Sequence, residues 1–284
     1  LVNADEELAD SFGTAAAEAH AAFGNPTLYV EKALVPARHV EIQVLCDDHD
    51  GVLTLGEREC SIQRRHQKLI EESPSPALDA ELREEMETAA ERACRHIDYR
   101  NAGTMEFLVG PDGAFSFIEM NTRLQVEHPV TELVTSLDLV REQVRIAAGE
   151  PLAHGGRTTH EGHAIELRIN AEDPQHDFRP SPGRLTRFRP PLGPGVRVDT
   201  FVEEGATISP YYDSLIAKVI VHDASRNLAI ERAQRVLGEF EIEGVATTRA
   251  VLTDILSSDE FRSGEYSTSF LEEAGARLPA LAGS

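Results

Sequence analysis

The sequence predicts an α+β fold, in which antiparallel strands and helices are mixed rather than regularly alternating. Apolar and polar residues alternate over His39–Leu45 and again over Val52–Arg58, and the acidic turn 47–51 joins the two stretches. Residues 104–109 and 114–121 indicate a second hairpin around Gly-Pro-Asp-Gly. Because no helix connects the strands of either pair, the strand-helix-strand units of a parallel sheet are not expected.

The other elements are predicted from residue type and from turn signals. An Ala- and Glu-rich helix spans Asp5–Gly24, and Asp79 caps a helix that ends near His96. The stretch 59–72 is dense in Arg, His, Gln and Lys and is expected to be irregular. Further helices are predicted at 129–148, 226–240 and 247–256, and further strands at 28–34, 163–170, 197–202 and 215–221.

Length and composition are those of a chain that buries a hydrophobic core. The 284 residues suit one large domain or two ordinary ones, and 41% are hydrophobic while 27% are charged. A polar segment with Gly155-Gly156 runs from Pro151 to Gly162. We therefore expect two domains, at residues 1–152 and 160–284.

Net charge limits the classes of partner. The chain has 27 Lys and Arg against 49 Asp and Glu, a formal net charge of −22, which disfavours nucleic acid and anionic membranes as partners. No stretch approaches the ~20 apolar residues of a membrane span, and no signal segment is recognisable. The three cysteines, Cys46, Cys60 and Cys94, are odd in number and widely spaced, as in a reducing compartment. A cytoplasmic location is expected.

The second hairpin carries a candidate metal site. If its four-residue turn joins the strands directly, Glu106 lies opposite Phe117 and on the same face as Glu119 and Asn121. Two carboxylates packed together would repel each other, whereas Mg²⁺ bridges hard oxygen ligands of this kind. The alternative is a solvated polar face of an amphipathic hairpin.

Two further clusters suggest anion binding. Arg123, Gln125 and Glu127 fall at alternate positions, so that an extended chain would place a guanidinium and a proton acceptor side by side. Arg58 and the segment 63–68 (QRRHQK) gather cations in an acidic chain, which suggests an anion or nucleotide partner. The alternatives are a surface ion pair and a solvated basic loop, respectively.

Taken in this order, the motifs resemble those of biotin carboxylase, the ATP-grasp component of biotin-dependent acetyl-CoA, propionyl-CoA and pyruvate carboxylases. Residues 57–68 (ERECSIQRRHQK) and 117–132 (FIEMNTRLQVEHPVTE) carry the closest similarity. It continues through residues 38–43, 162–173 and 210–218 and covers essentially the whole chain. The resemblance implies the C-terminal part of an ATP-grasp domain, with an antiparallel sheet and helices, followed by a biotin carboxylase C-terminal domain.

The resemblance also implies a site, with Arg123, Glu127, Lys68 and Arg168 as catalytic residues. The ATP-binding positions are Glu31, Lys32, Ala33, Leu34, His39, Gln63, His66, Glu106, Leu108, Ile118 and Glu119. Mg²⁺ or Mn²⁺ is expected at Glu106, Glu119 and Asn121. Bicarbonate is expected at Lys68, Arg123, Gln125, Val126 and Glu127, and biotin at Arg168 and Asp213.

The reaction implied is the ATP-dependent carboxylation of carrier-bound biotin by bicarbonate, through carboxyphosphate. It is the first half-reaction of acyl-CoA carboxylases, including the acetyl-CoA carboxylase of fatty acid biosynthesis, or of pyruvate carboxylase. Glu127 would remove the bicarbonate proton, Lys68 would screen the reacting anions, and Arg123 together with Arg168 would stabilise the biotin enolate.

Relatives carry an N-terminal α/β domain, a Gly-rich lid loop and two nucleotide-contacting lysines ahead of the position of Leu1. We therefore expect an N-terminally truncated fragment that is inactive alone. No Ala-Met-Lys-Met sequence occurs, so a separate biotin carboxyl carrier protein or domain and a carboxyltransferase subunit are the expected partners. Homodimerisation is a further expectation: Arg197 matches an interface position of the family, but Pro194 replaces an aromatic residue found in some relatives.

Two other functions are compatible with parts of this pattern. A segment of a carbamoyl-phosphate synthetase large chain would share the metal-binding carboxylates but would have no use for Arg168. A catalytically silent module that docks a carrier protein would keep the fold, although retention of the side chains from Lys68 to Glu127 argues against it.

Overall fold

The computed structural model describes residues 2, 4–153 and 155–282, in two compact units, Leu1–Val35 and Pro36–Ser284. The first unit contains η1 (Asp5–Glu7) and α1 (Leu8–Phe23), as predicted, and Gly24 ends α1 in the left-handed region with φ 70°. The strand predicted at 28–34 is not formed. Within the described residues this segment has no neighbouring strand, and without one its backbone groups cannot form a ladder.

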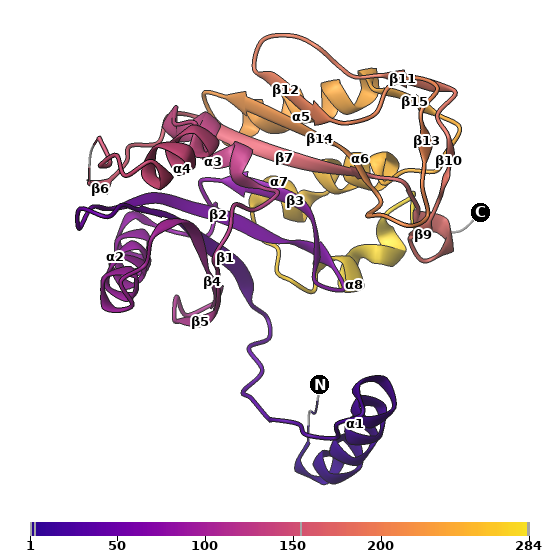
Figure 1. The fold of residues 1–284 in the computed structure, drawn as a ribbon. Helices are drawn as coiled ribbons and strands as arrows, with labels where there is room; N and C mark the ends of the chain where they lie inside the picture. Colours follow the sequence, from indigo (N-terminus) through magenta and orange to yellow (C-terminus); the bar gives the residue numbers. More distant parts are fainter. Residues whose placement is uncertain (1, 3, 154, 283–284) are drawn as a thin grey trace. The chain divides into compact units, whose positions relative to one another are not determined.

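The second unit is built on one large sheet (Figure 1), whose described strands lie in the order β12-β14-β7-β3-β2-β1-β4-β5, with β6 beside β2. Neighbouring strands along this path are antiparallel, which confirms the α+β class. Its strands are β1 (Arg38–Cys46), β2 (Val52–Arg64), β3 (Gln67–Ser73), β4 (Asn101–Val109), β5 (Phe115–Asn121), β6 (Gly156–Arg157), β7 (His163–Asn170), β12 (Val196–Thr200) and β14 (Leu215–Asp223).

Helices and short ribbons complete this unit. The described helices are α2 (Ala80–His96), α3 (His128–Thr135), α4 (Leu139–Ala147), α5 (Arg226–Glu239), α6 (Arg249–Ser257), α7 (Asp259–Ser263) and α8 (Phe270–Ala274), with the 3-10 turns η2 (Pro174–His176) and η3 (Gly275–Arg277). Three two-stranded ribbons pair β8 (Glu172–Asp173) with β9 (Arg179–Pro180), β10 (Gly183–Arg184) with β13 (Thr207–Ile208), and β11 (Arg187–Arg189) with β15 (Glu241–Glu243).

Alternation along the strands decides which side chains enter the core. Val40, Ile42 and Val44 of β1 pack with Met86 and Ala90 of α2 in one hydrophobic cluster. The residues between them therefore point to the opposite face of the sheet, away from α2. At the other end of the sheet, apolar residues of β7 and β14 pack with α5 and α6. These two cores hold the sheet that carries the candidate site.

Two sequence predictions are wrong in this unit. The stretch 59–72 is not irregular: β2 continues to Arg64, and β3 begins at Gln67. Its polar residues misled the prediction because several of them, among them Glu59, Lys68 and Glu72, are buried and paired with other charged groups. The helix predicted at 129–148 is two helices, interrupted at Ser136 with φ 58°, and Asp138 caps α4 by accepting a hydrogen bond from the Arg141 amide (2.8 Å).

One sheet runs through both predicted domains, because β3 pairs with β7 over Ile70–Ser73. The boundaries at 152 and 160 stay predictions.

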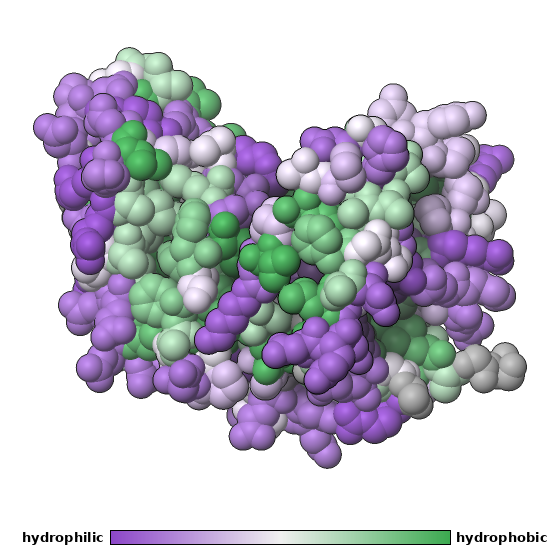
Figure 2. Space-filling model, turned by 90° about the horizontal axis from the view of Figure 1, so that it is seen from below, coloured by the Kyte–Doolittle hydropathy of each residue, from purple (hydrophilic) through white to green (hydrophobic). Residues whose placement is uncertain are grey.

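Within the described part of the chain, no helix combines the length and the apolar character that crossing a bilayer would require. Figure 2 shows green, apolar areas on one face of the molecule, bordered by purple, hydrophilic side chains.

Candidate active site

A row of charged side chains crosses four neighbouring strands of the sheet. Glu41 on β1 lies directly opposite Arg58 on β2 and opposite Glu106 on β4, and Glu106 lies opposite Glu119 on β5. Directly paired residues project from the same face of a sheet. The row lies on the face away from α2, because Val40 and Ile42, which flank Glu41, pack against that helix.

The register of the second hairpin differs from the prediction that Glu106 faces Phe117. The turn is one residue longer than expected, since the Gly110 amide donates to the Ala114 carbonyl (2.8 Å) and the ladder begins at Val109 and Phe115. The longer turn pairs Phe117 with Phe107, on the other face, and a bulge after this pair gives β5 one extra residue, so that Glu119 pairs with Glu106. The predicted proximity of Glu106 and Glu119 is thus reached through a different register.

Asn121 joins the two carboxylates. Its Nδ2 donates hydrogen bonds to Oε1 of Glu106 (2.9 Å) and to Oε1 of Glu119 (3.1 Å). Burial favours the neutral form of Glu106, but the contact with His39 and the charge of Lys68 outweigh it and lower its pKa to about 2. An ionised carboxylate beside a second carboxylate supplies the hard oxygen ligands that suit Mg²⁺ or Mn²⁺, and the amide nitrogen of Asn121 holds the two together.

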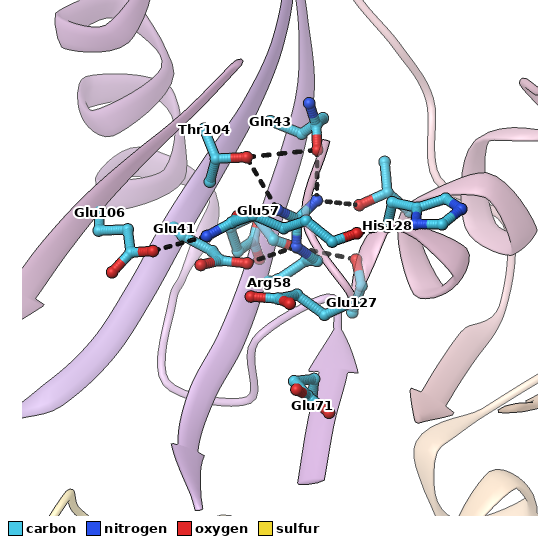
Figure 3. Close-up of polar contacts among 12 residues, drawn as sticks. Glu41, Gln43, Glu57, Arg58, Glu71, Thr104, Glu106, Glu127 and His128 are labelled. Carbon is cyan, nitrogen blue, oxygen red and sulfur yellow. Dashed lines mark hydrogen bonds and ion pairs between the residues drawn. The ribbon is translucent and has the colours of Figure 1, made fainter. Parts of the chain in front are cut away.

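Arg58 is fully buried at the centre of a polar network (Figure 3). Its guanidinium nitrogens donate to Glu41 Oε1 (2.5 Å), Gln43 Oε1 (2.7 Å), Gln125 Oε1 (2.9 Å), Thr131 Oγ1 (3.0 Å) and Thr104 Oγ1 (3.1 Å). With its donors engaged and no exposed surface, this arginine does not serve an external anion. The basic cluster predicted around it is not one surface: Arg64 and Arg65 pair with Asp177 instead.

Glu127 is held between two cations. Lys68 Nζ contacts one oxygen of Glu127 and also reaches Glu41 (2.7 Å), while Nη2 of Arg168 donates to the other oxygen of Glu127 (2.9 Å). Burial disfavours the charged form of Lys68, but the negative groups around it, Glu41 and Glu127 among them, raise its pKa above the ordinary value. Lys68 therefore stays a cation at neutral pH.

The segment between β5 and α3 is bent, not extended, and turns at Val126 and Glu127. Arg123 is exposed, and its Nη1 donates to the Leu124 carbonyl (3.3 Å); among the described contacts the guanidinium beside Glu127 is that of Arg168. The predicted alternation therefore fails. Gln125 points inward, donating to Glu106 (2.7 Å), and the Val126 carbonyl accepts from Lys218 (2.8 Å).

The remaining residues of the predicted site are spread over the chain. Nε2 of His39 lies 2.9 Å from Oε2 of Glu106, so this buried histidine adjoins the carboxylate row. Asp213 is exposed, and its carboxylate accepts from the Leu215 amide (2.8 Å). Gln63 and Leu108 are half-buried, whereas His66 and Ile118 are exposed; Glu31, Lys32, Ala33 and Leu34 belong to the first unit.

Sequence reasoning missed Glu41, Gln43 and Thr104, which accept hydrogen bonds from Arg58; Glu41 also accepts one from Lys68. A signal for the first two was present: in the predicted strand 39–45 they occupy every second position, opposite an apolar face. Such polar residues are ordinarily solvated, and only the covering of this face by other parts of the chain makes them part of a site.

Comparison with known proteins gives two matches to family models. The carbamoyl-phosphate synthase L chain, ATP binding domain, matches residues 1–155, and the biotin carboxylase C-terminal domain matches residues 166–273. Biotin carboxylase of Nostoc sp. is 53% identical over 278 residues, covering 96% of this chain and 61% of the relative. Biotin carboxylase 1 of Bacillus subtilis is 50% identical over 274 residues, with the same coverage.

A solved structure agrees with these matches. The biotin carboxylase domain dimer of Hydrogenobacter thermophilus 2-oxoglutarate carboxylase, in complex with MgADP, ADP and bicarbonate, has a TM-score of 0.91 and 46% identity, covering 96% of this chain and 60% of that one. The chain thus spans about three fifths of the length of these relatives. Its fold, its ordered pair of domains and these identities together show that the chain belongs to the biotin carboxylase family, with an ATP-grasp domain.

Proposed function

We propose that this chain supplies the residues that bind the metal, bicarbonate and biotin in a biotin carboxylase. Such a ligase carboxylates carrier-bound biotin with hydrolysis of ATP. The observation that carries the proposal is the position of Glu127, a buried carboxylate held by Lys68 from β3 and by Arg168 from β7. Such a carboxylate can accept a proton while the cations beside it attract an anionic substrate.

In the proposed reaction, Glu127 takes the proton of bicarbonate, and a bicarbonate oxygen attacks the γ-phosphate of ATP to give carboxyphosphate and ADP. Carboxyphosphate breaks into CO₂ and phosphate, and the phosphate takes the ureido proton of biotin. The biotin enolate then attacks CO₂ to give N-carboxybiotin. Lys68 reduces the repulsion between the anions that meet, and Arg168 stabilises the enolate oxygen.

Glu106 and Glu119 are the proposed metal ligands, oriented by the amide of Asn121. A divalent ion bound there supplies positive charge to the ATP phosphates. His39, Gln63, His66, Leu108 and Ile118, with the segment 31–34, are proposed to border the nucleotide. Arg123, Gln125 and the Val126 backbone are proposed to complete the bicarbonate site, and Asp213 the biotin site.

We further propose that residues 1–152 form the end of the lid and the catalytic part of the ATP-grasp domain, and that residues 160–284 form the C-terminal domain. The proposed partners are a biotin carboxyl carrier, a carboxyltransferase subunit and a second copy of the chain. A cytoplasmic location is supported by Cys46, Cys60 and Cys94, which are buried and free. Either acyl-CoA or a keto acid remains a candidate for the final acceptor.

The experiment compares ATP hydrolysis by this chain with hydrolysis by the same chain joined to the part of the Nostoc relative that it does not match. Hydrolysis that depends on both bicarbonate and free biotin is expected only in the joined protein, because this chain spans about three fifths of the length of the relatives. Robust turnover by the chain alone would contradict its proposed incompleteness.

Substitutions in the joined protein separate the roles within the site. Arg168→Ala should abolish biotin carboxylation while sparing nucleotide binding, whereas Glu119→Gln should weaken binding of the metal-nucleotide complex first. Glu203→Gln, at an exposed glutamate of the C-terminal part, is the matched control. Equal activity of the two site variants would favour the silent docking module, and loss of nucleotide binding in both would remove the assignment of Arg168 to biotin.

A further inference from the structure

Behind the candidate site lies a pair of glutamates for which the proposed reaction has no role. Glu71 on β3 and Glu166 on β7 are directly opposite each other in the antiparallel ladder, and both are fully buried. Residues paired in this way have Cβ atoms about 5 Å apart, so their carboxyl groups share one small space. Figure 3 shows Glu71 on its strand beside the network around Glu127.

The oxygens of this pair are mostly without hydrogen-bond donors. Among the described residues, neither carboxyl oxygen of Glu166 has a partner, and neither does Oε2 of Glu71. The remaining oxygen, Oε1 of Glu71, accepts from Nε of Arg168 (2.6 Å). Two ionised carboxylates in such a place would repel each other with no donor between them, whereas one shared proton supplies the missing donor.

The surroundings of Glu166 disfavour a second negative charge. Its neighbour across the ladder on β14 is Ile220, and Val130 of α3 packs with Ile220 in an apolar cluster. Burial, with the negative charge of Glu71 next, raises the pKa of Glu166 well above its ordinary value. Burial also raises the pKa of Glu71, against the attraction of Arg168. The other charged or titratable groups acting on the pair are Glu127 before α3, Lys68 on β3, Lys218 on β14 and Cys60 on β2.

We propose that Glu71 and Glu166 share a single proton and act as one monoanionic unit that positions Arg168 toward Glu127. Nε and Nη2 of Arg168 both contact Glu71, and Nη2 also donates to Glu127 (2.9 Å). One negative charge behind Arg168 fixes its orientation and leaves its positive charge effective on the side of Glu127. A second charge, gained when the proton leaves at alkaline pH, draws the guanidinium back and weakens the field at the site.

The proton is tested on this chain by infrared spectroscopy across a pH titration, which requires no catalysis. We expect the carbonyl stretch of a buried neutral carboxyl group at neutral pH, lost at alkaline pH. Glu166→Gln and Glu71→Gln should each abolish this band, because the single carboxylate that remains ionises beside Arg168. Glu203→Gln is the matched control and should retain it. If one variant fails to fold, as judged by circular dichroism, the other decides.

A wild-type spectrum without the band overturns the proposal, and so does a band that persists in a folded Glu166→Gln or Glu71→Gln variant. The positioning role rests on the proposed function and is tested in the joined protein. There Glu166→Gln should shift the alkaline limb of the pH profile to higher pH. The variant that carries both Glu71→Gln and Glu166→Gln should lower kcat/KM for biotin by roughly tenfold to a hundredfold, because Arg168 is no longer held in position. Nucleotide binding should change little. If the infrared band is present but Glu166→Gln leaves the pH profile unaltered, the shared proton is supported and the positioning role is overturned.

Discussion

At the scale of single residues, the stability of the fold depends on buried charged side chains that are paired with other polar groups. Arg58 has no exposed surface, yet each of its described contacts is with a carboxylate, an amide or a hydroxyl oxygen. Charges of this kind are costly to bury and are tolerated only while their partners remain. Removing one partner therefore lowers the free energy of unfolding by more than the intact pair contributes to it.

Arg58→Met should destabilise the protein by about 3–5 kcal/mol, because buried Glu41 loses one of its two cationic partners and keeps Lys68, and because the oxygens of Gln43 and Gln125 lose their donor. The control is Arg95→Met, which removes an exposed ion pair with Glu91 (2.9 Å) and should cost about 0.5 kcal/mol or less. The measurement is urea unfolding followed by circular dichroism, since the chain has no tryptophan. Similar losses in both variants would show that the buried network is not critical.

The ionisation of Glu72 makes the stability of the protein depend on pH in the acid range. It is buried and accepts hydrogen bonds from Arg226 (2.7 Å), from His163 (2.7 Å) and from Tyr266. Burial opposes ionisation, but the bonds from His163 and Arg226 outweigh it and lower the pKa from 4.5 to about 2. A folded-state pKa below the unfolded one stabilises the protein above the unfolded pKa, and this stabilisation is lost as pH falls from 4.5 toward 2.

Between pH 4.5 and pH 2, protonation of Glu72 should lower the free energy of unfolding by about 3 kcal/mol. Glu72→Gln should lower stability at neutral pH and should flatten its dependence on pH below 4.5. Glu84→Gln, at a largely exposed glutamate, should leave the dependence unchanged. Unfolding free energies at neutral and acid pH measure both effects, and identical slopes in wild type and Glu72→Gln would refute the assignment.

At the scale of elements, local signals place helix ends and strands, whereas a single residue can alter a register. The bulge in β5 places Glu119 opposite Glu106, which a regular hairpin with this turn would not do. By contrast, the start of α2 follows the sequence directly, since Asp79 Oδ1 accepts from the Leu82 amide (2.9 Å).

Asp79→Ala should destabilise α2 and the protein by about 1 kcal/mol, because an orphan amide at the helix start loses its acceptor. Asp79→Asn keeps an acceptor oxygen and should lie within a few tenths of a kcal/mol of the wild type. Thermal unfolding of the three proteins under the same conditions provides the measurement. An Asn variant as unstable as the Ala variant would mean that the charge of Asp79, not its capping bond, matters.

At the scale of the whole molecule, the large sheet joins residues 36–152 of the first predicted domain to the second predicted domain in one unit. β3 is the contact: Ile70 pairs with Leu167 of β7 and belongs to the same core as α5 and α6. The candidate site lies at this junction, because Lys68 comes from β3 and Arg168 from β7. Separating the domains would therefore remove both a strand pairing and a wall of the site.

Residues 36–152 expressed alone should lose cooperative unfolding, because β3 would keep an unpaired edge and an uncovered apolar side. Removing residues 2–35 should leave the transition of the remaining unit in place, since this segment is a compact unit of its own. Urea unfolding of both truncations tests the expectation. A cooperative transition in residues 36–152 would mean that the sheet is divisible at the predicted boundary.

The sequence by itself determined the α+β class, the first hairpin and α2 with its cap. These depend on alternation and turn residues within a few positions, which is the range over which backbone geometry acts. The tertiary structure alone decided the burial of Arg58, the absence of a strand at 28–34 and the meeting of Lys68, Glu127 and Arg168. Each of these depends on segments far apart in the chain, because a buried charge or a strand edge is stabilised only when a distant partner covers it.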